Sequence, residues 1–120
     1  MGYVAVDVET ASSRLQGYIC SIGVCVIDRG RIVEEFYTLV HPGIAMDPFC
    51  QNIHGISDEM VEGAPTTFEM LEKVAPYLAG QTVVAHTAPF DVKQIREAAE
   101  RVGFGLPEFD HCCTVKLSRQ

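Results

Sequence analysis

The sequence contains no tryptophan, few basic residues and no long apolar run. Its 9 lysines and arginines stand against 16 acidic residues, so the formal net charge is -7. A protein that holds nucleic acid by charge alone is expected to be basic, and this composition argues against such a passive binder. The composition is compatible with an enzyme whose acids bind divalent metal, because the ion then supplies positive charge where phosphate docks.

Similar absences argue against membrane and disulfide-stabilised classes. No apolar run approaches the ~18 residues needed to span a bilayer. The N-terminal MGYVAVDVET carries acids within its apolar run and has no basic leader, so we do not expect it to be a signal peptide. The five cysteines form no CxxC pair, and neither a zinc ribbon nor a disulfide framework is indicated. Reduced thiols in the cytoplasm are the simplest interpretation.

The chain length and the apolar pattern predict one domain that begins with strands. The 120 residues, 48% of them hydrophobic, fit a single domain over residues 1–120. Strands are expected over residues 3–9, 18–28 and 32–40, joined as an antiparallel meander. Residues 57–59 then look like a helix start with acids in the first turn.

The second half of the chain alternates helix and strand. Thr66 and Glu69 form a capping-box pattern that begins a helix, and Pro76 is expected to kink that helix near its end. A short strand over residues 82–85 and an amphipathic helix over residues 89–102 follow. This order predicts an α/β fold in which flanking helices pack on a mixed sheet, a meander plus a parallel strand.

Two carboxylates on the first strand carry the strongest chemical signal. Asp7 and Glu9 are two residues apart in a predicted strand, so both side chains leave the same face. An acid in a half-buried strand is costly unless it is paired, hydrogen-bonded or bound to a cation. Because hard cations such as Mg²⁺ choose oxygen ligands, the pair suggests a metal site. Ordinary surface charge on an exposed face is the alternative interpretation.

Asp91 adds a third acid to this hypothesis. The spacing of Asp91, Ile95 and Ala98 places the acid on the helix stripe that faces the sheet. A helix N-terminus favours an acid by ~0.3–1 kcal/mol, but this effect does not explain a buried position. We therefore expect the three acids to converge and to hold two metal ions that clamp a phosphodiester.

Three motifs, VAVDVET, HGI and VVAHTAPFD, occur in this order and resemble the DnaQ-like 3'-5' exonucleases of the DEDD superfamily. The stretches ICSIG and CTVKLSR are similar to a bacterial, DNA polymerase III epsilon-like branch of that family. The resemblance covers nearly the whole chain and implies a ribonuclease H-like fold, use of Mg²⁺ or Mn²⁺, and removal of nucleotides from 3' ends. It maps Asp7, Glu9 and Asp91 onto catalytic metal ligands.

The sequence departs from the family near its C-terminus. The family carries a third motif with a histidine general base and a fourth metal-binding aspartate, whereas this sequence ends at Gln120 before such a block. Loss of a general base removes a contribution of ~10²–10⁴-fold. We therefore expect a C-terminally incomplete domain with weak or absent activity. A second departure is Thr87, where relatives usually have asparagine.

The resemblance also implies which residues bind the substrate. It places His54 in contact with the terminal nucleotide, Ile53 or Ile56 packed on it, and the backbone of Thr10 at its sugar or phosphate. His86 would contact the substrate or order its motif, and Phe90 would stack on a base. The structural alternatives are a loop His54 that caps the following helix, a core His86 and core packing of Phe90.

Two functions remain open at this point. The first is a 3'-5' exonuclease that uses two metal ions and acts on a single-stranded 3' end of DNA or RNA. The alternative is a non-catalytic nucleic-acid or protein-binding module that keeps the fold. The missing motif favours the alternative, whereas the acids disfavour it, since they weaken passive phosphate binding. An uncovered sheet edge predicts a homo-oligomer, and no membrane partner is expected.

Overall fold

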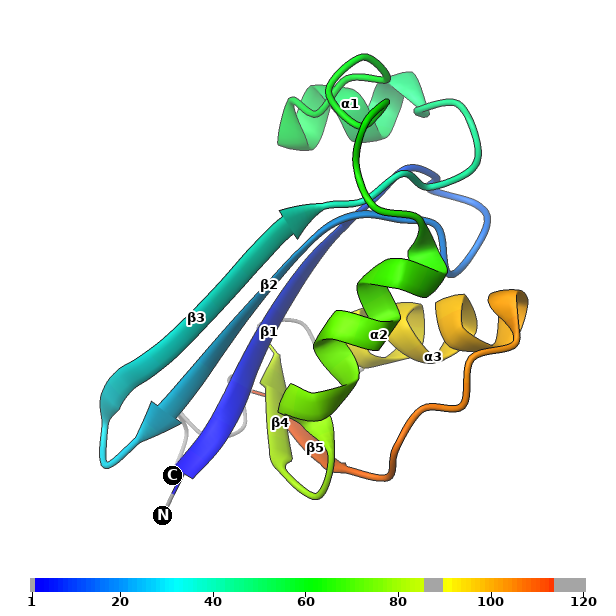
Figure 1. Cartoon of the computed structure of the whole chain (residues 1–120). Coiled ribbons are helices and arrows are strands. Elements are labelled where there is room, and N and C mark those ends of the chain that lie inside the picture. Colours follow the sequence, from blue (N-terminus) through cyan, green and yellow to red (C-terminus); the bar gives the residue numbers. More distant parts are fainter. Residues whose placement is uncertain (1, 86–89, 114–120) are drawn as a thin grey trace.

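The computed structural model describes residues 2–85 and 90–113 of the chain (Figure 1). The elements along this part are β1 (Gly2–Thr10), β2 (Ile19–Asp28), β3 (Arg31–Leu39), α1 (Pro48–His54), α2 (Thr67–Leu78), β4 (Thr82–Ala85), α3 (Phe90–Val102) and β5 (Asp110–Cys113). The strands form one sheet in the order β3-β2-β1-β4-β5. β1, β2 and β3 are an antiparallel meander, and β4 runs parallel to β1 and to β5. The predicted mixed sheet is confirmed.

Alternate valines of β1 direct one face of the sheet into the core. Val4, Val6 and Val8 are buried, whereas Asp7 between them is exposed. Both α2 and α3 cover the valine face, as Figure 1 shows, while α1 lies beyond the carboxyl end of β1. The helices contribute apolar stripes to this core, namely Met70, Leu71, Val74, Leu78, Val92, Ile95, Ala98 and Ala99. The burial of Asp91 with Ile95 and Ala98 confirms the stripe predicted for α3.

The start of α2 confirms the predicted capping box. The Thr66 side chain accepts a hydrogen bond from the Glu69 N–H at 3.2 Å, and Glu69 Oε1 accepts one from the Thr66 N–H at 2.9 Å. The helix passes Pro76 and ends two residues later at Leu78. Because proline removes one N–H and clashes with the preceding turn, it is tolerated here only close to the helix end.

The helix expected to start at residues 57–59 is wrong, since residues 58–63 form turns. The helix lies earlier, as the short α1, which the sequence analysis missed. Asp47 caps it by accepting from the Phe49 N–H at 2.9 Å, Pro48 occupies its first turn, and Gly55 ends it at a φ of 73°. Asp58 instead accepts a hydrogen bond from the Met46 N–H at 2.8 Å, so its carboxylate serves a neighbouring loop.

Within the described ranges, no helix combines the length and the apolar character needed to cross a bilayer. The final strand of the described part, β5, starts at Asp110.

The capping box gives a prediction for stability. Replacing Thr66 by Ala removes the acceptor of the Glu69 N–H, and we expect the free energy of unfolding to fall by about 1 kcal/mol. Thr66→Ser keeps the hydroxyl and should retain most of the stability. Urea denaturation followed by circular dichroism measures both variants, and an unchanged midpoint for Thr66→Ala would show that the cap is not formed in solution.

Candidate active site

His54 joins α1 to the end of β1. Its Nδ1 accepts a hydrogen bond from the Ile56 N–H at 3.0 Å, so the ring proton lies on Nε2. Nε2 then donates to the carbonyl oxygen of Thr10 at 3.0 Å, with Cys20 Sγ at 3.6 Å. His54 is therefore the last residue of a helix and not a loop residue that caps a following one. Its ring fixes the distance between α1 and the first strand.

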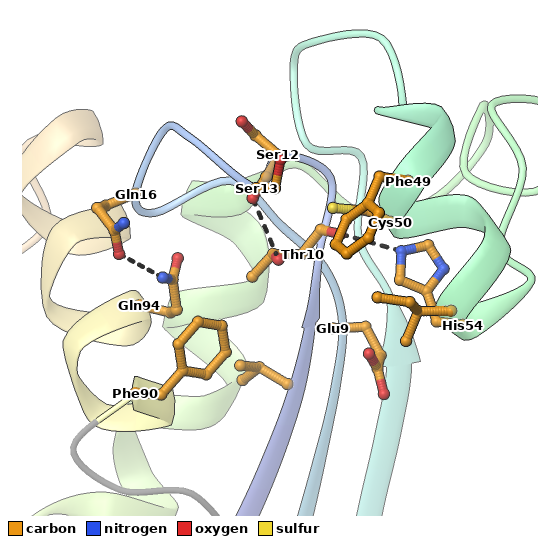
Figure 2. Close-up of a pocket in the computed structure, with 12 residues that line it drawn as sticks. Glu9, Thr10, Ser12, Ser13, Gln16, Phe49, Cys50, His54, Phe90 and Gln94 are labelled. Atoms are coloured by element: carbon orange, nitrogen blue, oxygen red, sulfur yellow. Dashed lines mark hydrogen bonds between the residues drawn. The ribbon is translucent and has the colours of Figure 1, made fainter.

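A cavity of about 340 Å³ opens between α1, the β1–β2 loop and the start of α3 (Figure 2). Five residues that the sequence analysis assigned to the site line it together: Glu9, Thr10, Ile53, His54 and Phe90. The side chain of Phe49 on α1 is 63% exposed and that of Phe90 on α3 is 46% exposed. The cavity thus has an aromatic ring on each of two walls.

A second hollow of about 510 Å³ lies on the sheet face opposite the core. Asp7 and Glu9 both line it, which confirms that the two carboxylates leave the same face of β1. Glu9 and His54 border both hollows. The two acids therefore lie where the open sheet face meets the aromatic cavity.

The electrostatics of Glu9 fit a cation at this place. Burial raises the pKa of the Glu9 carboxyl, and the negative charge of Asp7 raises it further. The nearby His54 partly offsets this by lowering the same pKa. A divalent cation would relieve this repulsion, and Mg²⁺ is often held by one or two carboxylates together with substrate phosphates. The two carboxylates are thus oxygen donors of the kind that a hard divalent cation prefers.

The thiol of Cys20, which lies next to the His54 ring, carries no charge. Burial, followed by the nearby charges of Glu9 and Cys50, raises the pKa of the Cys20 thiol to about 12. The thiol is therefore neutral at physiological pH. The buried Cys20 thus packs as a small core residue.

The structure does not bring the third acid into the same group. Among the described residues, no three His, Cys, Asp or Glu side chains gather in a way that could hold a metal ion. Asp91 is 2% exposed, and its helix packs on the valine face, whereas Asp7 and Glu9 leave the other face. Phe90, directly before Asp91, nevertheless lines the cavity with Glu9. The convergence of the three acids stays a prediction, and His86 and Thr87 lie outside the described residues.

The sequence analysis missed the contacts between the β1–β2 loop and α3. Gln94 is 2% exposed and accepts a hydrogen bond from the Gly17 N–H at 2.8 Å. Arg101 Nη2 donates to the Gly17 carbonyl at 3.0 Å, and its guanidinium lies 4.1 Å from the centre of the Tyr18 ring. The sequence does carry a signal for Gln94, because it is a polar residue within the apolar stripe of α3, between Asp91 and Ile95.

Comparison with known sequences decides the family. The RNase T family, described as Exonuclease, matches residues 4–120. The chain belongs to this 3'-5' exonuclease family. It is 36% identical over 118 residues to a PolC-type DNA polymerase III of Caldanaerobacter subterraneus subsp. tengcongensis, and 34% identical over 119 residues to the 3'-5' exonuclease DinG of Bacillus subtilis. The matches cover 98% of this chain but only 8% and 13% of those two proteins.

Solved structures of the exonuclease family share the fold. Exonuclease X in complex with 5' overhanging duplex DNA superimposes with a TM-score of 0.74 at 30% identity, covering 98% of this chain and 62% of that one. The nuclease domain of 3'hExo bound to rAMP gives a TM-score of 0.76 at 19% identity, covering 90% and 62% of the two chains. The ribonuclease H-like fold expected from the motifs is therefore confirmed.

The contact of Gly17 with α3 yields a matched pair of variants. Gly17 and Gly43 both have a φ of 85°. A Cβ at Gly17 would lie 2.7 Å from the Ala98 nitrogen, while one at Gly43 would meet no atom of the described residues within 4 Å. Positive φ alone costs an L-residue about 1 kcal/mol, so Gly43→Ala should lose roughly that much stability.

Gly17→Ala carries the same backbone cost and an additional clash of about 1–3 kcal/mol. Its free energy of unfolding, measured by urea denaturation, should therefore fall at least twice as far as that of Gly43→Ala. Equal losses for the two variants would contradict the close packing of the β1–β2 loop on α3.

Proposed function

We propose that this exonuclease-family domain removes nucleotides from a single-stranded 3' end and releases nucleoside 5'-monophosphates. The observation that carries the proposal is a cavity of about 340 Å³, with Glu9 and His54 on its border and exposed Phe49 and Phe90 on two walls. This volume is within the range of small-ligand pockets. Base stacking on aromatic rings is tolerant of sequence, as a nuclease that acts on successive nucleotides requires.

In this proposal Asp7, Glu9 and Asp91 hold two Mg²⁺ or Mn²⁺ ions. Bound ions of this kind activate water and stabilise the leaving oxygen of a phosphodiester. The chain's own residues place the substrate. The parallel strands β1 and β4 end at the same edge of the sheet, and α3 starts near that edge with Phe90 in the cavity. This placement supports the approach of Asp91 to the other two acids.

His54 has a positioning role in this proposal. Both of its ring nitrogens make hydrogen bonds within the protein, one with the Ile56 N–H and one with the Thr10 carbonyl. The ring therefore offers its face, and not a free nitrogen, to the terminal nucleotide. Thr10 follows an irregularity in the β1–β2 pairing between Glu9 and Thr10. Such bulges occur often beside active sites, where they redirect a side chain or backbone group.

The nature of the nucleic acid is proposed from the solved relatives. One of them was determined with 5' overhanging duplex DNA and another with a histone mRNA stem-loop. We infer that the chain accepts DNA or RNA through contacts to the 3' end. The lack of a three-ligand group among the described residues favours a second candidate, a nucleic-acid-binding module without catalysis.

Mononucleotide release tests the proposal. With Mn²⁺ and a 3'-labelled oligonucleotide, we expect slow release of the labelled mononucleotide, and Asp7→Asn should lower its rate by roughly 10²-fold or more because a metal ligand is lost. Glu62→Gln, at an exposed turn residue that lines neither hollow, is the control and should leave the rate unchanged.

A form of the chain extended at its C-terminus belongs in the same assay. Release by the extended form alone would still support the exonuclease proposal. Release by neither form, together with binding of the oligonucleotide, would establish the non-catalytic module instead.

We further propose that two copies associate through the β3 edge of the sheet. Among the described strands, β3 has a neighbour on one side only, and it exposes Ile32, Val33 and Tyr37. Edge strands with exposed apolar side chains favour pairing, and lysine on an edge opposes it. Sedimentation velocity should show a concentration-dependent dimer that Val33→Lys converts to a monomer. A monomer at every concentration would rule out this association.

A further inference from the structure

Two glutamine side chains on one wall of the cavity form a chain of hydrogen bonds with a fixed direction. The Gly17 N–H donates to Gln94 Oε1 at 2.8 Å. Gln94 Nε2 in turn donates to Gln16 Oε1, and Figure 2 shows this pair on the α3 side of the cavity, across from His54. A side-chain amide has one accepting end and one donating end. Each link therefore determines how the next amide is turned.

The backbone sets this direction. A main-chain N–H can only donate, so Gly17 requires the oxygen of Gln94, and the nitrogen of Gln94 requires the oxygen of Gln16. Gly17 is itself held in place, because its carbonyl accepts from Arg101 Nη2 at 3.0 Å. The side chain of Gln94 is 2% exposed. If its amide were reversed, Gln94 Nε2 would face the Gly17 N–H, and two buried donors would be left without an acceptor. Gln16, which is exposed, is thus left with its amide nitrogen as the outer donor.

The serine side chains of this wall also make hydrogen bonds within the protein. Ser13 Oγ donates to Asp47 Oδ2 at 2.8 Å. Ser12 Oγ accepts from the Arg14 N–H at 3.1 Å and from the Leu15 N–H at 2.9 Å, so both of its acceptor positions are used while its single hydroxyl hydrogen can still donate. Among the described residues that line the cavity, none is a lysine or an arginine. A negatively charged strand in this cavity needs neutral donors, and Gln16 has two N–H groups to offer.

We propose that Gln16 is a substrate-binding residue whose amide nitrogen donates to a phosphate oxygen of the bound strand, and that Gln94 is the positioning residue that aims it. The inference rests on the proposed function, since it requires a nucleic-acid strand in the cavity. Neither residue touches the reacting atoms. Their contribution is to affinity, and it is independent of base sequence.

Binding of short 5'-fluorescein-labelled oligo(dT) and oligo(dA), followed by anisotropy in Ca²⁺, tests the contact directly. Gln16→Ala should weaken the binding of both by about three- to tenfold, the effect of one lost hydrogen bond. Gln16→Glu should weaken it further, because a carboxylate then faces the phosphates. Gln81→Ala, an exposed glutamine that lines neither hollow, is the matched control and should bind as the wild type does.

Gln94→Glu tests the positioning role. A carboxylate at residue 94 still accepts from the Gly17 N–H but no longer donates, so Gln16 should turn its nitrogen inward and its oxygen toward the strand. We expect a loss of affinity equal to that of Gln16→Ala. In the Gln16→Ala background the same change should add nothing, since residues that act through one contact are not additive. Thermal denaturation checks the fold of each variant. If Gln94→Glu is unstable, Gln16→Ala and Gln16→Glu, which change an exposed residue, still test whether Gln16 contacts the strand.

The outcomes separate this inference from the proposed function. A wild-type chain that binds neither oligonucleotide would overturn both. Wild-type binding that Gln16→Ala leaves unchanged would overturn the Gln16 contact alone. A loss seen with oligo(dT) but not with oligo(dA) would overturn the phosphate assignment, because adenine has no carbonyl oxygen and the contact would then lie on the base. Additive losses in the double variant would overturn the positioning role of Gln94.

Discussion

The alternation of side chains along β1 is the constraint on which the site depends. Val4, Val6 and Val8 are buried against α2 and α3, and the same alternation commits Asp7 and Glu9 to the opposite face. Burying a valine is worth about 1.5–3 kcal/mol. A slip of one residue would expose the valines and bury both acids. The core therefore fixes the location of the carboxylates from the other face of the sheet.

Packing also explains the shape of the cavity, whose walls come from segments far apart in the chain. Thr10 belongs to β1, Phe49 and His54 to α1, and Phe90 and Gln94 to α3. Hydrogen bonds between side chains and backbone hold these segments at a fixed spacing, through the His54 ring on one side and the Gln94 amide on the other. The loop between β1 and β2 lies between these two anchors and takes its conformation from both.

Sequence reasoning succeeded where the signal is local and failed where it is not. The strands, the Thr66 capping box and the buried stripe of α3 follow from periodicity and from spacings of a few residues, and all are confirmed. The short α1 has no periodic apolar run, and its signals are a capping Asp47, a proline and a terminal glycine. The contact between Gly17 and Gln94 spans 77 positions of the chain. No spacing rule finds such a contact, which explains why the site residues were recognised mainly through the motifs.

Helix α1 has only seven residues, fewer than an isolated helix needs in water, yet it is pinned at both ends. Its capping Asp47 accepts from Ser13 Oγ, and the Asp47 N–H donates to the Ala11 carbonyl at 2.8 Å. At the other end, His54 donates to the Thr10 carbonyl. Folding has therefore already met the entropic cost of ordering this wall. A nucleotide would enter a preorganised pocket, and its affinity would reflect contacts rather than the closure of a mobile lid.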